Sequence, residues 1–164
     1  MTEKKIAHRL FVTWLRSDTV AHNINMFPFE SDVLALKPSG NLIEYEIKIS
    51  VSDFRADFKK RKKPRRYINE KGFTRHEFLQ SGKGANKFYY VMPSEIYEKV
   101  SGEVPDWAGV ITAGTGVDLH GEYLGLTIKR MPKNLHSRKF YSDTKEKIMK
   151  AMYWKAWNKL EANS

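Results

Sequence analysis

Apolar and polar residues alternate most regularly between residues 41 and 50. Because successive side chains of a β-strand point to opposite faces of a sheet, this alternation predicts a strand with one buried face. The apolar positions are Ile43, Tyr45, Ile47 and Ile49, and the polar positions are Glu44, Glu46, Lys48 and Ser50. The strand would therefore carry two carboxylates and one ammonium group on a single face.

A second strand is predicted just before the first, in the short apolar run of residues 32–36. Residues 37–41, Lys-Pro-Ser-Gly-Asn, separate the two runs, and their proline and glycine are typical of a tight turn. The two strands are therefore expected to form an antiparallel hairpin, with Gly40 available for a positive φ in the turn.

This hairpin would bring acidic residues of its two strands together. Counting back from a Lys37–Asn41 pair sets Asp32 opposite Glu46, with Glu30 opposite Lys48. Opposed residues of a hairpin share a face, with Cβ atoms about 5 Å apart, and two carboxylates at that distance repel each other. A divalent metal ion between them would remove the repulsion, whereas the plain alternative is a solvated strand face.

A helix is expected directly after the hairpin, because residues 50–53, Ser-Val-Ser-Asp, form a capping box. Its buried side would consist of Val51, Phe54 and Phe58, which have helical spacing. The helix then becomes basic, and Pro64 ends or kinks it. The basic run contains Lys59, Lys60, Arg61, Lys62, Lys63, Arg65 and Arg66.

Such a cluster of cations repels itself unless it meets a polyanion. We therefore predict that the basic run grips the phosphate backbone of DNA without reading the base sequence. The alternative is a solvated surface helix or a basic run that resembles a targeting signal.

The remaining patterns predict an α/β fold in one domain, with a central mixed β-sheet flanked by helices in the order α-β-β-β-α-β. An extra strand and a C-terminal helix would follow this core. Helical spacing covers residues 3–16, 93–100 and 144–160, and strands are expected within residues 18–29, 86–93, 107–113 and 123–130. Residues 65–87 are polar and longer than an ordinary connection, which favours a loop that clamps substrate.

The C-terminal helix combines aromatic residues with lysines. We expect Tyr153, Trp154 and Trp157 to pack on the core while the surrounding lysines stay in water. The alternative is a second surface that contacts DNA.

Composition agrees with a globular nucleic-acid-binding domain. Over 164 residues, 41% are apolar and the formal net charge is +10, which suits DNA, although an acidic protein or an anionic membrane surface would also fit. The absence of cysteine leaves no disulfide or thiolate site, and no apolar run is long enough for a membrane span. We therefore expect a cytoplasmic protein, in the host cytoplasm if a phage encodes it.

The order of these motifs resembles the PD-(D/E)XK nuclease superfamily, and most closely its small stand-alone bacterial and phage members. The resemblance rests on Asp32, on Glu46-Ile-Lys48 and on the helix motif Ser50…Asp53-Phe-Arg-Ala-Asp57-Phe-Lys. It extends in order of elements over about residues 4–130 and includes the aromatic strand Asn-Lys-Phe-Tyr-Tyr-Val-Met-Pro at residues 86–93. One departure is that Ser31, not proline, precedes the aspartate.

The resemblance implies a restriction-endonuclease-like core and a site for Mg²⁺ or Mn²⁺. It assigns Asp32 and Glu46 as metal ligands and Lys48 as the residue that positions the attacking water and offsets developing negative charge. For an additional acid, which some members place on the first helix, Glu3 and Glu30 are both open.

We therefore expect a metal-dependent DNA nuclease that hydrolyses phosphodiester bonds in DNA repair, recombination or phage DNA processing. Two alternatives stay open: a DNA-binding module that keeps the nuclease fold without cutting, and a basic protein that binds an acidic protein partner. Endonuclease and exonuclease action, and a homodimer, are left open as well.

Overall fold

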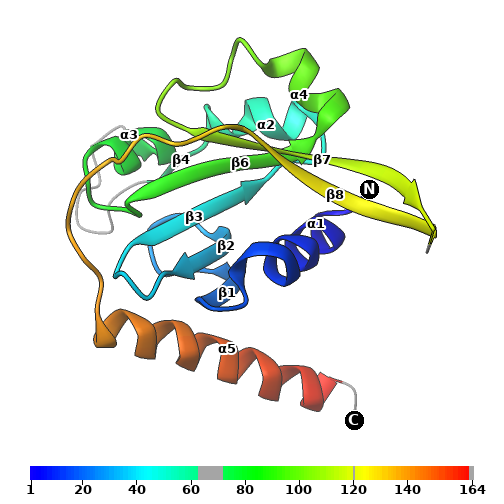
Figure 1. The fold of residues 1–164 in the computed structure, drawn as a ribbon. Helices are drawn as coiled ribbons and strands as arrows, with labels where there is room; N and C mark the ends of the chain where they lie inside the picture. The colour runs from blue at the N-terminus through cyan, green and yellow to red at the C-terminus, as the bar shows by residue number, and fades with distance from the viewer. Residues whose placement is uncertain (63–71, 120, 163–164) are drawn as a thin grey trace.

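The computed structural model describes residues 1–62, 72–119 and 121–162. Its centre is a six-stranded sheet with helices on both faces, as Figure 1 shows, so the predicted α/β class is confirmed. The sheet is mixed, because β3–β6 and β6–β7 are parallel while the other neighbours are antiparallel. In spatial order the strands are β1 (Thr19–Ile24), β2 (Ser31–Leu36), β3 (Leu42–Ile47), β6 (Lys87–Pro93), β7 (Gly109–Asp118) and β8 (Gly121–Arg130).

The β2–β3 hairpin has the register that the sequence predicted. Leu36 pairs with Leu42 and Val33 with Tyr45, and the Lys37 amide donates to the Asn41 carbonyl at 2.8 Å. Gly40 takes a φ of 79° in the turn, a conformation that glycine adopts without strain. Continuing this register by one residue sets Asp32 opposite Glu46.

Two helical layers sandwich the sheet. The helix α1 (Glu3–Leu10) covers one face, where Tyr45 and Tyr89 stack at 5.3 Å between ring centroids. The opposite face carries the second core around Phe88 and Tyr90. Its covering helices are α2 (Val51–Asp57), α3 (Arg75–Gln80) and α4 (Ser94–Val100).

The predicted first helix ends in a π-helical turn, η1 (Phe11–Leu15). A π-helix is hydrogen-bonded from residue i to i+5 rather than i+4 and is wound more widely than an α-helix, so Leu15 comes closer to the side that carries Leu10. Both leucines are fully buried, whereas Phe11 is 43% exposed.

The basic run does not extend α2, and here the sequence prediction was wrong. The helix ends at Asp57, a turn follows, and Arg61 already belongs to a two-stranded hairpin of β4 (Arg61–Lys62) and β5 (Phe73–Thr74). Within residues 65–87, predicted as a loop, the structure forms β5 and α3. The predicted DNA contacts Lys63, Arg65 and Arg66 lie outside the described residues.

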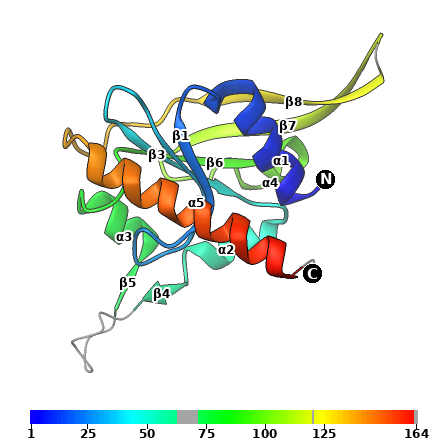
Figure 2. The same cartoon turned by 90° about the horizontal axis from the view of Figure 1, so that it is seen from below.

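The C-terminal part of the chain forms two extensions. Strands β7 and β8 continue beyond the sheet as a paired arm, and α5 (Ser142–Ala162) runs beside the edge strand β1 (Figures 1 and 2). The prediction that the α5 aromatics pack on the core was wrong: Tyr153, Trp154 and Trp157 are all more than half exposed. No helix in the described part of the chain has the length and apolarity to cross a membrane.

Candidate active site

Asp32, Glu46 and Lys48 lie together at one end of the sheet, where β2 begins and β3 ends. The Asp32 carboxylate accepts a hydrogen bond from the Ile47 amide at 2.7 Å, which ties the start of β2 to the end of β3. The Lys48 ammonium donates to Glu46 Oε1 at 2.8 Å, and both side chains are buried. The polar face of β3 is therefore an interior ionic site rather than a solvated strand face.

Arg75, the first residue of α3, completes this site from the helical layer that covers this face of the sheet. Its Nη1 lies 2.5 Å from Glu44 and 2.6 Å from Glu46, and its Nη2 donates to the Glu30 carbonyl at 2.7 Å. The guanidinium group is buried and stands over the Phe29 ring at 5.5 Å. One arginine thus joins β3 to α3 and to the segment that enters β2.

Asp57, at the end of α2, is a further buried carboxylate on this face, beside Glu44 and Glu46. It lies 3.5 Å from Lys48 Nζ and 3.6 Å from Arg75 Nε, and it accepts a hydrogen bond from the Tyr90 hydroxyl at 2.9 Å. The same hydroxyl is 2.6 Å from Nε2 of His76. Since β6 supplies Tyr90 and α3 supplies His76, Asp57 holds three elements in place around the Lys48 ammonium.

Burial dominates the electrostatics of the carboxylates. It raises the pKa of Asp32 to about 6, against the hydrogen bond from Ile47, and nearby Glu3 raises this pKa further. Burial also raises the pKa of Glu46, an effect that Arg75 opposes and Asp32 reinforces. The pKa of Glu44 is raised by burial for the same reason.

The two cations are held in their charged forms. Burial lowers the pKa of Lys48, but Glu46 and Asp57 raise it more, so the net pKa lies above its ordinary value. Arg75 behaves likewise. Four acids therefore surround two cations, and full ionisation would leave an excess of two negative charges. The acids are Asp32, Glu44, Glu46 and Asp57, and the cations are Lys48 and Arg75.

The additional acids that the sequence left open now have positions. Glu3, near the start of α1, lies close enough to raise the pKa of Asp32. The expected Glu30–Lys48 strand pair is absent from the ladder, because β2 begins at Ser31 and β3 ends at Ile47. Glu30 is exposed, and its carboxylate accepts a hydrogen bond from Asn25 at 3.4 Å.

The donor set matches a hard divalent cation more closely than a soft one. Among residues 1–62, 72–119 and 121–162, no group of three or more His, Cys, Asp or Glu side chains is arranged to hold a metal ion. Mg²⁺, however, is commonly bound by one or two carboxylates together with water and substrate phosphates. Asp32 and Glu46, with their raised pKa values, are the two carboxylates that fit this description.

Sequence analysis missed Arg75 and the role of Asp57, although one local signal was present. Thr74 and Glu77 form a reciprocal capping box at the start of α3, and the spacing Thr-x-x-Glu is visible in the chain. That signal predicts the helix, but it does not indicate that Arg75 turns inward. The inward direction depends on Glu44 and Glu46, which lie about thirty residues earlier.

The described part of the basic run lies beyond α2. Lys59, Lys60 and Lys62 are exposed, while Arg61 is engaged by the Gly72 carbonyl and by Glu77. A groove of about 680 Å³ follows the outer side of α2, and its lining includes Ser52, Arg55 and Lys59. The groove reaches the start of the basic run at Lys59, and its lining contains none of the carboxylate-site residues.

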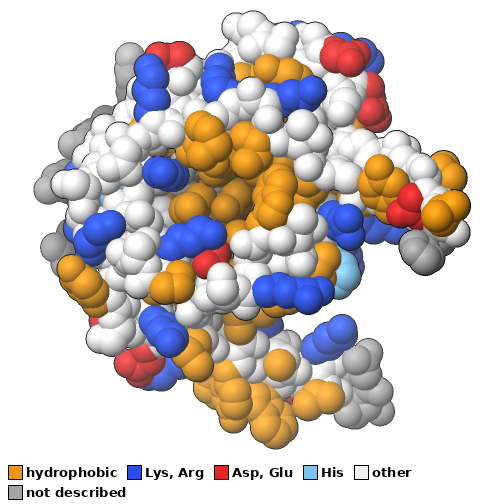
Figure 3. Space-filling model, viewed as in Figure 1, with side chains coloured by type: hydrophobic (Ala, Val, Ile, Leu, Met, Phe, Trp, Pro, Cys, Tyr) orange, Lys and Arg blue, Asp and Glu red, His pale blue; other side chains and the backbone are white. Residues whose placement is uncertain are grey.

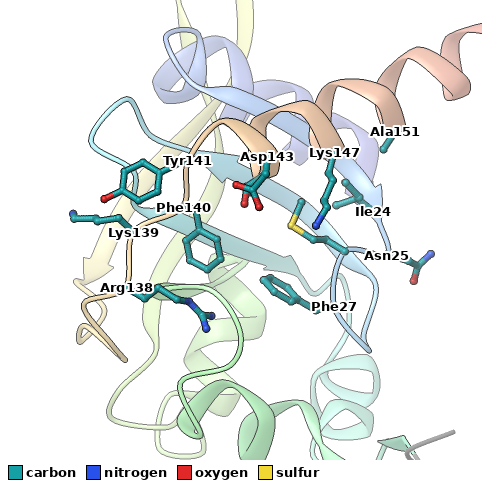
Figure 4. Close-up of a pocket in the computed structure, with 12 residues that line it drawn as sticks. Ile24, Asn25, Phe27, Arg138, Lys139, Phe140, Tyr141, Asp143, Lys147 and Ala151 are labelled. Carbon is teal, nitrogen blue, oxygen red and sulfur yellow. The ribbon is translucent and has the colours of Figure 1, made fainter.

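A separate pocket of about 700 Å³ lies between the β1–β2 connection and the start of α5 (Figure 4). Phe27 and Phe140 line it together with Arg138 and Lys147. It contains none of the residues of the carboxylate site.

Comparisons with known proteins define the fold only. No protein-family model and no curated protein matches the chain. Among solved structures, it is similar to the SPO1766 protein of unknown function from Silicibacter pomeroyi, with a TM-score of 0.57 and 16% identity, over 99% of this chain and 90% of that chain. At this identity the similarity establishes a shared architecture and carries no information about activity.

Proposed function

We propose that this protein is a metal-dependent DNA nuclease of the PD-(D/E)XK type, with a restriction-endonuclease-like core. The observation that carries the proposal is the buried site at the end of the β2–β3 hairpin, where carboxylates outnumber cations. A divalent cation would compensate the excess charge, and Asp32 and Glu46 would hold it. When bound, Mg²⁺ or Mn²⁺ would polarise the scissile phosphate and acidify a water molecule.

Lys48 is the residue proposed to act directly on the reacting groups. Its ammonium group is a compact point charge that can orient a nucleophilic water and offset negative charge that develops on the phosphate. Glu46 and Asp57 hold it at 2.8 and 3.5 Å. Because the two acids keep Lys48 protonated, its proposed role is electrostatic and does not require it to accept a proton.

Arg75 and Asp57 are proposed as positioning residues. Arg75 holds Oε2 of Glu46, the oxygen that Lys48 does not contact, and so fixes the Glu46 rotamer. Asp57 fixes the direction of the Lys48 side chain. Substrate phosphates would approach along the outer side of α2 and reach Lys59, Lys60 and Lys62. These contacts are sequence-independent, which fits a nuclease that recognises the DNA backbone.

The test is incubation of the purified protein with linear, circular, single-stranded and branched DNA in Mg²⁺, Mn²⁺ or EDTA. We expect metal-dependent products that disappear in Glu46→Ala, with DNA binding retained. The matched control is Glu98→Ala, because Glu98 is an exposed acid on α4 outside the carboxylate site. Full activity of the Glu46→Ala protein would reject the site assignment.

One observation favours a second candidate, a DNA-binding module that keeps the fold without cutting. Both carboxylate oxygens of Glu46 are engaged, Oε1 by Lys48 and Oε2 by Arg75, so metal binding must displace or share these contacts. This candidate predicts salt-sensitive DNA binding, no products from any substrate, and no effect of Mg²⁺ on thermal unfolding.

A further inference from the structure

The outward side of α5 is apolar although its inward side is already buried. Ile148 and Thr144 are buried against the β1 side, and Ala151 and Met152 pack around them. The opposite side has its own stripe at helical spacing, and every member is more than half exposed. The stripe consists of Met149, Tyr153, Trp157 and Leu160, with Trp154 at its flank.

This stripe forms one contiguous surface. The Tyr153 ring contacts both Trp154 and Trp157, each at 6.0 Å between centroids. A shallow groove of about 400 Å³ continues it toward Met149 and Lys145. Figure 3 shows apolar side chains gathered over α5 at the bottom of the view. A surface of this kind marks an interaction site, because scattered apolar residues would not touch one another.

Charge indicates the class of the partner. Lys145, Lys147 and Lys159 are exposed around the stripe, Lys150 pairs with Glu146 at 2.6 Å, and the whole chain carries a net charge of +10. A second copy of this face would bring two lysine-rich helices together, which is unfavourable. Aromatic rings between lysines are instead the arrangement that binds single-stranded nucleic acid, where bases stack on the rings and phosphates meet the ammonium groups.

The attachment of α5 fixes its position along the edge strand β1. Lys155 donates to the carbonyl groups of His22 and Asn23 on β1. In the β1–β2 ladder His22 pairs with Val33, so Asn23 stands opposite Asp32. The aromatic half of α5 therefore lies level with Asp32, across the edge strand.

We infer that the outward face of α5 binds single-stranded nucleic acid by stacking bases on Tyr153, Trp154 and Trp157. The face would hold the unpaired strand on the side of α5 that points away from β1. This binding does not depend on metal or on cleavage, so it stands apart from the proposed nuclease activity.

The test is fluorescence anisotropy with a labelled oligodeoxythymidine and with a blunt duplex, both in EDTA. The Trp154→Ala/Trp157→Ala protein should bind the single strand about tenfold or more weakly, and the duplex within about twofold of wild type. The Trp154→Phe/Trp157→Phe protein retains aromatic rings and should keep most of the single-strand affinity. Because EDTA is present throughout, the measured affinity does not depend on whether the protein cuts DNA.

Tyr141→Ala is the matched control, because Tyr141 is an equally exposed aromatic residue outside α5. It should bind the single strand as wild type does. Unchanged binding by the tryptophan-to-alanine protein would overturn the inference. The inference would also be overturned if the stripe served another partner. In that case the tryptophan-to-alanine protein would lose self-association in sedimentation velocity, or binding to phosphatidylserine vesicles, while it still bound the oligonucleotide.

Discussion

The carboxylate site and the outward face of α5 break the usual rule that charged side chains are exposed and apolar side chains are buried. The first region buries charges, and the second exposes apolar rings. At the end of the hairpin, Glu46, Lys48 and Arg75 are charged and buried. On α5, Trp154 and Trp157 are apolar and exposed. Buried charges cost free energy unless they are paired, and exposed aromatic surface gains none of the free energy of burial. Each region would therefore be completed by a ligand: a divalent cation and phosphate in one, unpaired bases in the other.

The two regions also differ in how many secondary-structure elements hold their side chains in place. The ionic site is fixed from β2, β3, β6, α2 and α3, so its charges cannot relax into water. The α5 stripe projects from one helix that is attached along β1. Substitutions should consequently be costly for folding in the first region and nearly neutral in the second.

The largest effect is expected for Arg75→Ala. The substitution leaves Glu44 and Glu46 buried without their common cation, which should cost about 3–5 kcal/mol of unfolding free energy. Urea denaturation measures this cost. Arg55→Ala is the control, because Arg55 also pairs with a glutamate, Glu103, but at the surface. Its stability should stay near wild type, and an equal loss in both proteins would show that burial of the pair is not decisive.

A smaller but clear contrast is expected between the two sides of α5. Ile148→Ala removes a fully buried side chain and should lower the unfolding free energy by about 2–4 kcal/mol. Trp154→Ala removes a side chain that is 63% exposed and should change it by less than about 0.5 kcal/mol. Thermal or urea unfolding checks both values. A large loss from Trp154→Ala would mean that the outward stripe is structural.

The third prediction, which is the most diagnostic for function, concerns a smaller change in stability at Asp32. Its pKa is about 6 in the folded protein, against 3.8 for an ordinary aspartate. Between these values the folded state retains a proton that the unfolded chain has released, so this group makes stability fall as the pH rises from about 4 to 6. Asp32→Asn should therefore stabilise the protein by about 1–2 kcal/mol at pH 7.5 and by much less at pH 4.

Urea denaturation at the two pH values, beside Glu30→Gln as the exposed-acid control, measures this difference. Mg²⁺ should stabilise the wild-type protein at pH 7.5 and have little effect on Asp32→Asn, because the ionised Asp32 carboxylate is the proposed ligand. If Asp32→Asn destabilised the protein at pH 7.5, the conclusion that the ionised, partly buried Asp32 carboxylate lowers the unfolding free energy would be wrong.

The sequence by itself determined the elements with strong local signals. Alternation predicted β3, the turn around Gly40 predicted the hairpin, and the pairing arithmetic predicted that Asp32 faces Glu46. These features depend on neighbours a few residues apart, so periodicity and turn chemistry suffice. The C-terminal helix was also predicted, because its helical spacing extends over many residues.

Only the tertiary structure decided which polar groups are buried and which aromatic groups are exposed. Arg75 turns inward because Glu44 and Glu46, far away in sequence, provide its partners. The α5 helix has apolar residues on two sides, and its sequence does not specify which side meets the core. Lys155 and Ile148 decide this by fitting the edge of β1, and that contact leaves Tyr153, Trp154 and Trp157 in solvent. Side-chain direction depends on long-range packing, which no local pattern contains.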